Sequence, residues 1–167
     1  MASLKYKPGK FDLVVKRASA GLGLFVGETP IPRGACIIEY TGPAISEEEK
    51  YKSRSKYLFD LDNGTTIDGQ SRANKARYIN HSCKPNCEPN IHRNRVFIHA
   101  TRNIKPGEEL GYDYGLAYFD AYIGENCRCA GCAPKPVAKA VAKAAKPVKA
   151  AKTRKTAGGG KTLQAAE

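Results

Sequence analysis

Cysteines are the residues whose type and spacing most directly indicate chemistry in this 167-residue sequence. Six are present: Cys36, Cys83, Cys87, Cys127, Cys129 and Cys132. The last three fall within one short segment, and Cys83 and Cys87 form a second pair. In a reducing compartment such clustering indicates a bound metal before it indicates disulfides. Free cysteines without a metal are the alternative, and Cys36, in an expected strand, is interpreted as a small core residue.

Two polar side chains, Asn80 and His81, stand in a stretch flanked by apolar residues. Buried polar groups need hydrogen-bond partners, and an adenine edge and an amino-acid carboxylate are suitable ones. Gly21 and Gly23 would let the backbone approach such a ligand closely. A plain β-turn at the glycines and an ordinary core histidine are the alternative readings.

These residues belong to four stretches that, in this order, resemble the SET-domain lysine methyltransferases. The stretches are Gly21-Leu22-Gly23 before Leu24-Phe25, then Glu39-Tyr40-Thr41-Gly42, then Arg77-Tyr78-Ile79-Asn80-His81-Ser82-Cys83 with Pro85-Asn86, and last Gly107-Glu108-Glu109-Leu110-Gly111-Tyr112-Asp113-Tyr114. The third and fourth stretches together are the most specific. The resemblance covers about residues 11–132.

The resemblance implies S-adenosylmethionine as cofactor and assigns roles to two sets of residues. Those expected to contact the cofactor are Ala20, Gly21, Leu22, Gly23, Tyr57, Arg77, Asn80 and His81. Those expected at the catalytic centre are Tyr40, Tyr112 and Tyr114.

Methyl transfer to nitrogen requires alignment and a neutral amine, whereas a free lysine, with a pKa near ~10.4, arrives protonated. A channel lined by tyrosines beside a cationic sulfonium lowers that pKa by desolvation and by repulsion between like charges. The position of Tyr112 carries Phe or Tyr in the family. A hydroxyl there takes the space of further methyl groups, which implies mainly mono-methylation.

The segment from Cys127 to Cys132 resembles the zinc-binding post-SET segment of the family. By that resemblance one structural Zn²⁺ is bound by Cys83, Cys127, Cys129 and Cys132. Four thiolates make a closed site without an open catalytic position. The spacing between Cys129 and Cys132 is two residues shorter than is usual in the family, and Cys87 is a rival for Cys83 as the fourth ligand.

The elements expected to position these residues are mostly short strands with turn signals between them. Strands are expected at residues 11–16, 35–40, 65–68, 95–101 and 110–114, a short helix from the capping box of Ser46 and Glu49, and a helical turn at 73–78. The predicted class is mainly β with little helix. The resemblance adds the β-clip fold of SET domains: small curved sheets and a C-terminal pseudoknot, in which the last motif threads under the loop that carries Asn80 and His81.

Charge divides the chain into a folded part and a tail. The net charge is +12, and residues 133–167 contribute eight Lys and one Arg against the single acid Glu167. This Ala/Lys/Pro-rich segment contains no aromatic residue and is expected to be disordered. We expect it to bind DNA non-specifically, with a solubilising tail as the alternative. The expected division is a SET domain at 1–118, a zinc segment at 119–132 and the tail at 133–167.

The sequence therefore predicts an S-adenosylmethionine-dependent protein-lysine N-methyltransferase acting on a histone or histone-like basic protein. An inactive SET-fold binding module, attached to chromatin or DNA by its tail, is the alternative. The N-terminus lacks a secretory signal pattern, and no apolar run approaches the ~20 residues of a membrane span. We therefore expect an intracellular protein, in the nucleus or nucleoid and otherwise in the cytoplasm, without a membrane partner.

Overall fold

The computed structural model describes residues 5–61 and 63–132. They belong to a compact unit of residues 1–135, and residues 136–167 make up a second unit. The first unit contains both the expected SET domain, 1–118, and the expected zinc segment, 119–132. The expected tail, 133–167, with its predicted disorder and DNA binding, lies outside the described residues. None of the helices within 5–61 and 63–132 has the length and apolar character that crossing a membrane requires.

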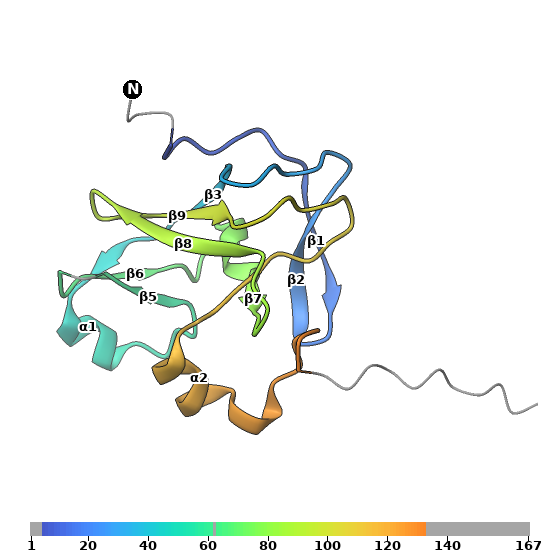
Figure 1. Ribbon diagram of the computed structural model, residues 1–167. Helices are drawn as coiled ribbons and strands as arrows, with labels where there is room; N and C mark the ends of the chain where they lie inside the picture. The colour runs from blue at the N-terminus through green and yellow to red at the C-terminus, as the bar shows by residue number, and fades with distance from the viewer. Residues whose placement is uncertain (1–4, 62, 133–167) are drawn as a thin grey trace, which may run out of the picture. The chain divides into compact units, whose positions relative to one another are not determined.

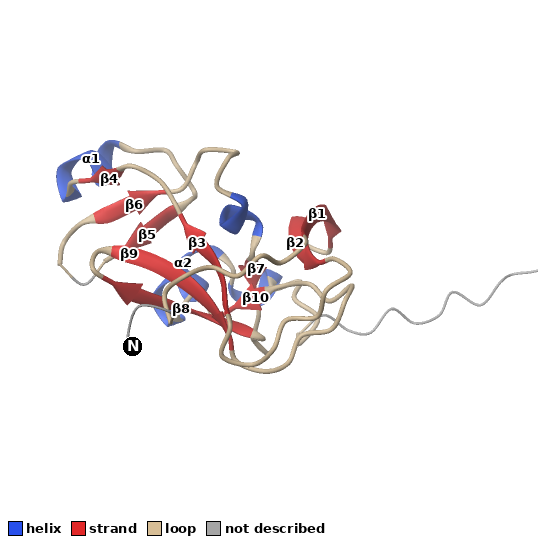
Figure 2. Cartoon of the chain, turned by 90° about the horizontal axis from the view of Figure 1, so that it is seen from above, coloured by secondary structure: helices blue, strands red, loops and turns tan. Residues whose placement is uncertain are grey.

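Within the described residues, ten short strands form four small sheets (Figure 1). They are β1 (Leu13–Ala18), β2 (Gly21–Val26), β3 (Cys36–Tyr40), β4 (Ala44–Ile45), β5 (Leu58–Asp60), β6 (Thr66–Asp68), β7 (Asn80–His81), β8 (Cys87–His92), β9 (Arg95–Ala100) and β10 (Gly111–Tyr112). The sheets have the orders β1-β2, β3-β9-β8, β4-β6-β5 and β10-β7. Figure 2 shows the β1-β2 hairpin and the β4-β6-β5 sheet at opposite ends, with the other two sheets between them.

Helix is scarce and short. The helices are α1 (Glu47–Lys52), α2 (Leu116–Tyr122) and the 3-10 turns η1 (Lys75–Tyr78) and η2 (Gly124–Asn126). The expected capping box is confirmed, because the Glu49 N–H donates to Ser46 Oγ and the Ser46 N–H donates to the Glu49 carboxylate. The helical turn expected at 73–78 is the 3-10 turn η1. The prediction of a mainly β protein with little helix is therefore confirmed.

The β7-β10 pair brings the third and fourth motifs together. Its two strands are parallel, with Gly111 opposite Asn80 and Tyr112 opposite His81. The following loop closes on β10 as well, since the Ser82 N–H donates to the Tyr112 carbonyl at 2.9 Å and the Asn86 N–H to the Gly111 carbonyl at 3.1 Å. The Asn86 side chain adds bonds to the Gly111 N–H and the Glu109 carbonyl. The last motif is thus enclosed by the segment that carries Asn80 and His81, which is the arrangement expected of the pseudoknot.

The apolar core lies between the hairpin, the β3-β9-β8 sheet and this strand pair. Its residues include Leu24, Val26, Ile37, Ile79, Val96, Ile98, Ile104 and Leu110. Leu24 and Leu110 are connected by a backbone hydrogen bond of 2.8 Å, so the glycine-rich motif on β2 is fixed against the last motif. Tyr40 and Tyr112 are members of the same core, and the catalytic candidates therefore stand on its rigid part.

Candidate functional site

Three tyrosines predicted at the catalytic centre converge from two sheets. Tyr40 ends β3 and is 4% exposed, and Tyr112 ends β10 and is 8% exposed. Tyr114 follows two residues later, and its ring lies 4.9 Å from that of Tyr112, centroid to centroid. Because β10 pairs with β7, the two C-terminal tyrosines are held beside Asn80 and His81.

Two of the tyrosine hydroxyls are oriented by main-chain carbonyls. Tyr40 Oη donates to the Tyr57 carbonyl at 2.8 Å, and Tyr114 Oη donates to the Ile79 carbonyl at 2.7 Å. A phenol has one proton to donate and two lone pairs to accept with. Each oxygen is therefore left as an acceptor for an N–H group that enters the site.

These tyrosines are held in their neutral form. Burial raises the pKa of Tyr40, Tyr112 and Tyr114 above the ordinary value. The Asp68 carboxylate raises that of Tyr40 further, and neighbouring tyrosines raise those of Tyr112 and Tyr114. A phenolate in this cluster would be desolvated and close to other phenol oxygens. At neutral pH the cluster therefore offers neutral hydrogen-bonding groups and no tyrosinate base.

Asn80 and His81 find partners within the protein. Asn80 Nδ2 donates to the Leu22 carbonyl at 3.1 Å and to Glu109 Oε1 at 2.8 Å. His81 Nδ1 accepts from the Tyr114 N–H at 3.3 Å, and His81 Nε2 lies 3.2 Å from Cys83 Sγ. The argument that such polar groups require partners holds, but protein atoms satisfy much of that requirement.

Two adjoining cavities meet at Ala20, Asn80 and His81, which line both. The larger has a volume of about 370 Å³ and is also lined by Tyr114, Tyr118, Cys127 and Cys129. The smaller has a volume of about 220 Å³ and extends along Ser82, Glu109 and Gly111. Small-molecule sites commonly occupy roughly 300–1,000 Å³, so the two cavities together have a suitable size.

The glycine-rich motif forms the start of β2 rather than an isolated turn. Gly21 has a φ of 120°, which favours glycine, and a Cβ placed there would meet open space. At Gly23 a Cβ would crowd the Glu109 carboxylate and the Ala18 Cβ, so a side chain there would force these neighbours to shift. Leu22 is 52% exposed. Of the four residues 20–23, only Ala20 lines the cavities.

Tyr57 and Arg77 contact each other. The Arg77 guanidinium carbon lies 3.7 Å from the centre of the Tyr57 ring, and Arg77 Nη1 donates to the Gln70 carbonyl. Arg77 Nε is buried without a partner within 5–61 and 63–132. Neither side chain lines the two cavities, although Tyr57 reaches the catalytic candidates through its carbonyl, which accepts from Tyr40.

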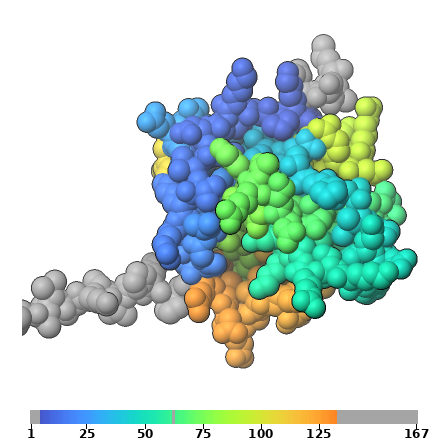
Figure 3. Space-filling model, turned by 180° about the vertical axis from the view of Figure 1, so that it is seen from behind, coloured from blue at the N-terminus to red at the C-terminus, as the bar shows by residue number. Residues whose placement is uncertain are grey.

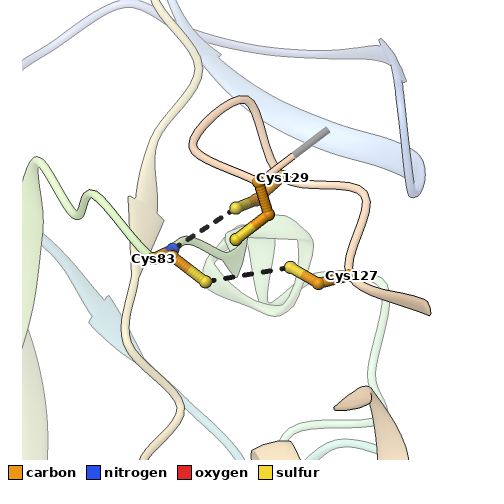
Figure 4. Close-up of side chains that lie close together, drawn as sticks. Cys83, Cys127 and Cys129 are labelled. Atoms are coloured by element: carbon orange, nitrogen blue, oxygen red, sulfur yellow. Dashed lines mark hydrogen bonds between the residues drawn. The ribbon is translucent and has the colours of Figure 1, made fainter. Parts of the chain in front are cut away.

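Four cysteines converge beside the larger cavity (Figure 4). The sulfurs of Cys83, Cys127, Cys129 and Cys132 all lie within 4.8 Å of one another. Tetrahedral zinc with Zn–S bonds of ~2.3 Å places sulfurs about 3.8 Å apart, and Cys83 and Cys127 are 3.9 Å apart. Cys87 is fully buried, and its thiol donates to the Gly111 carbonyl at 3.4 Å. The geometry therefore favours Cys83 over Cys87 as the fourth member.

The cysteine cluster also contains a group poised to ionise. Burial raises the pKa of Cys129, but N–H donors that include the Cys83 backbone outweigh it and bring the value to about 7. The Cys83 N–H lies 3.4 Å from the Cys129 sulfur. A thiolate is the form that binds a metal.

Two tyrosines at the site were absent from the sequence-based set. Tyr118 packs edge-on against Tyr114 at 5.3 Å, and Tyr122 packs on Tyr118 at 4.7 Å. Both line the larger cavity. Tyr114, Tyr118 and Tyr122 recur every four residues, a spacing that aligns side chains on one face of a helix. This signal was available in the sequence.

The segment from α2 to Cys132 covers one side of the larger cavity. In Figure 3 its orange surface borders the blue surface of the β1-β2 hairpin. Ser19 Oγ donates to the Arg128 carbonyl at 2.6 Å across this border. Hairpin, cysteine segment and strand pair β7-β10 thus enclose one site.

Comparisons with known proteins point to one family. The family profile described as the SET domain matches residues 21–115. The histone-lysine N-methyltransferase ash1 of Drosophila melanogaster is 41% identical over 112 residues, which cover 60% of this chain and 5% of that protein. The histone-lysine N-methyltransferase ASHH3 of Arabidopsis thaliana is 36% identical over 135 residues, 73% of this chain and 37% of that protein.

A solved structure agrees with the fold. It is described as "ctPRC2 in an autoinhibited conformation bound to S-adenosylmethionine" and aligns with a TM-score of 0.58 and 34% identity, over 64% of this chain and 15% of that one. The expected fold class is thereby confirmed. The chain spans well under half the length of the relatives it matches.

Proposed function

The chain belongs to the SET-domain family, and from that premise we propose that it is a protein-lysine N-methyltransferase that uses S-adenosylmethionine. The observation that carries the proposal is the clustering of Tyr40, Tyr112 and Tyr114. Tyr114 lines the larger cavity together with Asn80 and His81. The relatives ash1 and ASHH3 are named histone-lysine N-methyltransferases, which supports the same reaction here.

The two cavities fit the cofactor in size, and the residues that line them fit it in chemistry. S-adenosylmethionine supplies a sulfonium-activated methyl group. Ala20, Asn80 and His81 line both cavities and would hold it, with Gly21, Leu22 and Gly23 forming the adjoining backbone. Asn80 Nδ2 already donates to the Leu22 carbonyl and to Glu109, which leaves its Oδ1 as an oriented acceptor. Tyr57 and Arg77 would contribute at the edge of this site.

The tyrosines would prepare the lysine amine. A tyrosine-lined site desolvates an entering ammonium and lowers its pKa, which favours the neutral amine. The Tyr40 and Tyr114 oxygens, whose protons are donated to carbonyls, accept the amine N–H groups and align the nitrogen. Because all three tyrosines have raised pKa values, the amine proton passes to water and not to a tyrosinate.

Tyr112 would limit the number of methyl groups added. Its side chain is buried, and its ring packs beside that of Tyr114. Further methyl groups on the amine would need the space and the hydrogen-bonding capacity that the Tyr112 hydroxyl occupies. We therefore propose mainly mono-methylation.

A structural Zn²⁺ is proposed at Cys83, Cys127, Cys129 and Cys132. The close approach of four sulfurs supports it. All four positions would be taken by protein ligands, so the metal would hold the segment after α2 against the site and take no part in the transfer.

The proposed substrate is a histone or histone-like basic protein, as the names of the relatives suggest. A protein acting on such substrates would be associated with chromatin or a nucleoid. Exposed acids near the site, Asp113, Asp120 and Glu125, have the charge to attract a basic polypeptide.

The decisive experiment is incubation of the protein with isotopically labelled S-adenosylmethionine and a panel of basic proteins, followed by mass spectrometry of lysine-containing peptides. Label on lysine is expected, mostly as a single methyl group. A protein that binds cofactor or substrate but transfers no label would contradict the proposal and favour an inactive binding module.

A further inference from the structure

The His81 ring is held by the protein at both of its nitrogens. Its side chain is only 6% exposed. Nδ1 accepts from the Tyr114 N–H at 3.3 Å, and Nε2 lies 3.2 Å from Cys83 Sγ. The ring also packs against Tyr114 at 5.5 Å and Phe119 at 5.0 Å. A single side chain thus contacts a catalytic candidate and a member of the cysteine cluster.

The direction of these hydrogen bonds fixes the tautomer. A backbone N–H can only donate, so Nδ1 must present its lone pair to Tyr114. The proton of the neutral ring then resides on Nε2 and points at the Cys83 sulfur. The Asp113 carboxylate, 3.7 Å from Nδ1, is exposed and accepts from the Gly115 N–H at 3.0 Å instead.

The Tyr114 end of this connection is itself oriented. Its backbone N–H is fixed by His81, and its hydroxyl donates to the Ile79 carbonyl, one residue before β7. The ring plane of Tyr114 is therefore set by two bonds to the same short segment, 79–81. Loss of the imidazole would release one of them.

We propose that His81 is a positioning residue that couples the cysteine cluster to Tyr114. The inference rests on the proposed zinc centre. A metal-bound Cys83 thiolate accepts strongly from Nε2–H, whereas a protonated thiol accepts weakly. A Cys83 thiolate that holds the metal would fix the ring through Nε2–H, and the ring holds the Tyr114 N–H through Nδ1. Groups that support metal ligands in this way commonly change metal affinity or activity by roughly 10–100-fold when removed.

Three substitutions of His81 distinguish its hydrogen bond to Tyr114 from its hydrogen bond to Cys83. His81→Asn keeps an acceptor near the place of Nδ1 and removes the donor to Cys83. His81→Gln keeps a donor near the place of Nε2 and removes the acceptor for Tyr114. His81→Phe removes both and keeps a ring against Phe119. His92→Gln is the matched control, because His92 stacks on Tyr6 at the end of β8.

The first measurement tests the contact between His81 and Cys83, and it does not depend on enzyme activity. The full-length protein is loaded with Co²⁺, and the thiolate-to-cobalt charge-transfer band is recorded. A hydrogen bond to a thiolate lowers the energy of its lone pair, so the band should move to longer wavelength in His81→Asn and His81→Phe and stay in place in His81→Gln and His92→Gln. Release of zinc by a thiol-alkylating reagent should be roughly 10-fold faster in the first two.

The second measurement tests the contact between His81 and Tyr114. His81→Gln and His81→Phe should have a kcat roughly 10-fold below that of His81→Asn, with a smaller difference in the KM for lysine substrate. Circular dichroism confirms that each variant is folded.

Identical cobalt spectra in all variants would overturn the contact with Cys83. Equal loss of kcat in the Asn and Gln variants would overturn the separate role of Nδ1. If the wild-type protein transfers no methyl group, the proposed function fails while the cobalt band still tests the inference. If one equivalent of Co²⁺ does not bind, the inference itself fails.

Discussion

At the scale of single residues, the hydroxyl of Tyr114 is the most informative atom of the site. It donates to the Ile79 carbonyl, which leaves its oxygen to align an amine. Tyr114→Phe should therefore reduce turnover by on the order of 10² or more, as expected for a positioned group, while cofactor affinity persists. Tyr51→Phe is a matched control, since Tyr51 is 80% exposed on α1. Steady-state rates and calorimetric titration with cofactor measure both effects, and a variant with near wild-type turnover would reject the role.

Tyr112 determines a different property, the degree of methylation. Tyr112→Phe removes a buried hydroxyl and opens room beside the Tyr114 ring, so products should shift toward di- and tri-methyl-lysine. Mass spectrometry of a peptide substrate gives the distribution. Wild-type protein that already makes mostly tri-methyl-lysine would contradict the assignment.

The raised pKa values of the tyrosines predict the shape of the pH profile. Since the neutral phenol is favoured in Tyr40, Tyr112 and Tyr114, each stays protonated beyond the ordinary value of ~10. The value of kcat/KM should rise with pH as the substrate ammonium ionises, without a decline from tyrosine ionisation below about pH 10. Initial rates in overlapping buffers measure the profile. A descending limb below that pH that disappears in Tyr40→Phe would show that a tyrosinate forms.

At the scale of elements, the cysteine segment after α2 is the part that a metal should hold in place. Purified protein should contain about one zinc, and Cys129→Ser should lose both the metal and activity. Cys87→Ser is the matched control, because a serine hydroxyl can still donate to the Gly111 carbonyl that the Cys87 thiol contacts. Elemental analysis decides the matter, and an active preparation without metal would reject the site.

Sequence patterns predicted some helices and strands well and failed to predict others, in each case for a physical reason. The strands around β3, β6 and β9 and the capping box of α1 follow apolar alternation and local hydrogen bonding, and they were predicted close to their positions. Strand β8 was missed because Pro89 resembles a loop signal, yet β8 lies at the edge of its sheet, where a missing N–H is tolerated. Strand β2 was missed because its first residues are glycines.

The site residues, like the elements, include some that the sequence predicted and some that it did not. Motif residues that belong to β7 and β10 were predicted from the resemblance, and the structure brings them together. Tyr118 and Tyr122 were missed because α2 lacks a side-chain N-cap and buries no residue completely, so their four-residue spacing stood without a helix start signal beside it. The distance between Arg77 and the cavities could not be predicted, since it depends on how η1 packs.

At the scale of the whole molecule, charge is concentrated in the tail outside the described residues. We predict that the full-length protein binds DNA with an affinity that falls steeply with salt, by about 0.9 logarithmic units per neutralised phosphate for each tenfold rise in salt. Replacing the eight tail lysines by glutamine should abolish this dependence and leave methylation of a short peptide unchanged. Fluorescence anisotropy over a salt series measures it, and an unaltered slope would place the DNA contact elsewhere.

The parallel pairing of β7 with β10 has a consequence for how the protein is made. Asn80 and His81 acquire their partners Glu109 and Tyr114 only when residues 109–114 have arrived, about thirty positions later in the chain. During synthesis on the ribosome, everything before that point can collapse into hairpins while the site does not yet exist. Long-range parallel pairing is a slow step, and Cys83 meets its three partner thiols after it. We therefore expect the proposed metal to bind only after this pairing, and a nascent chain interrupted earlier to lack an assembled site.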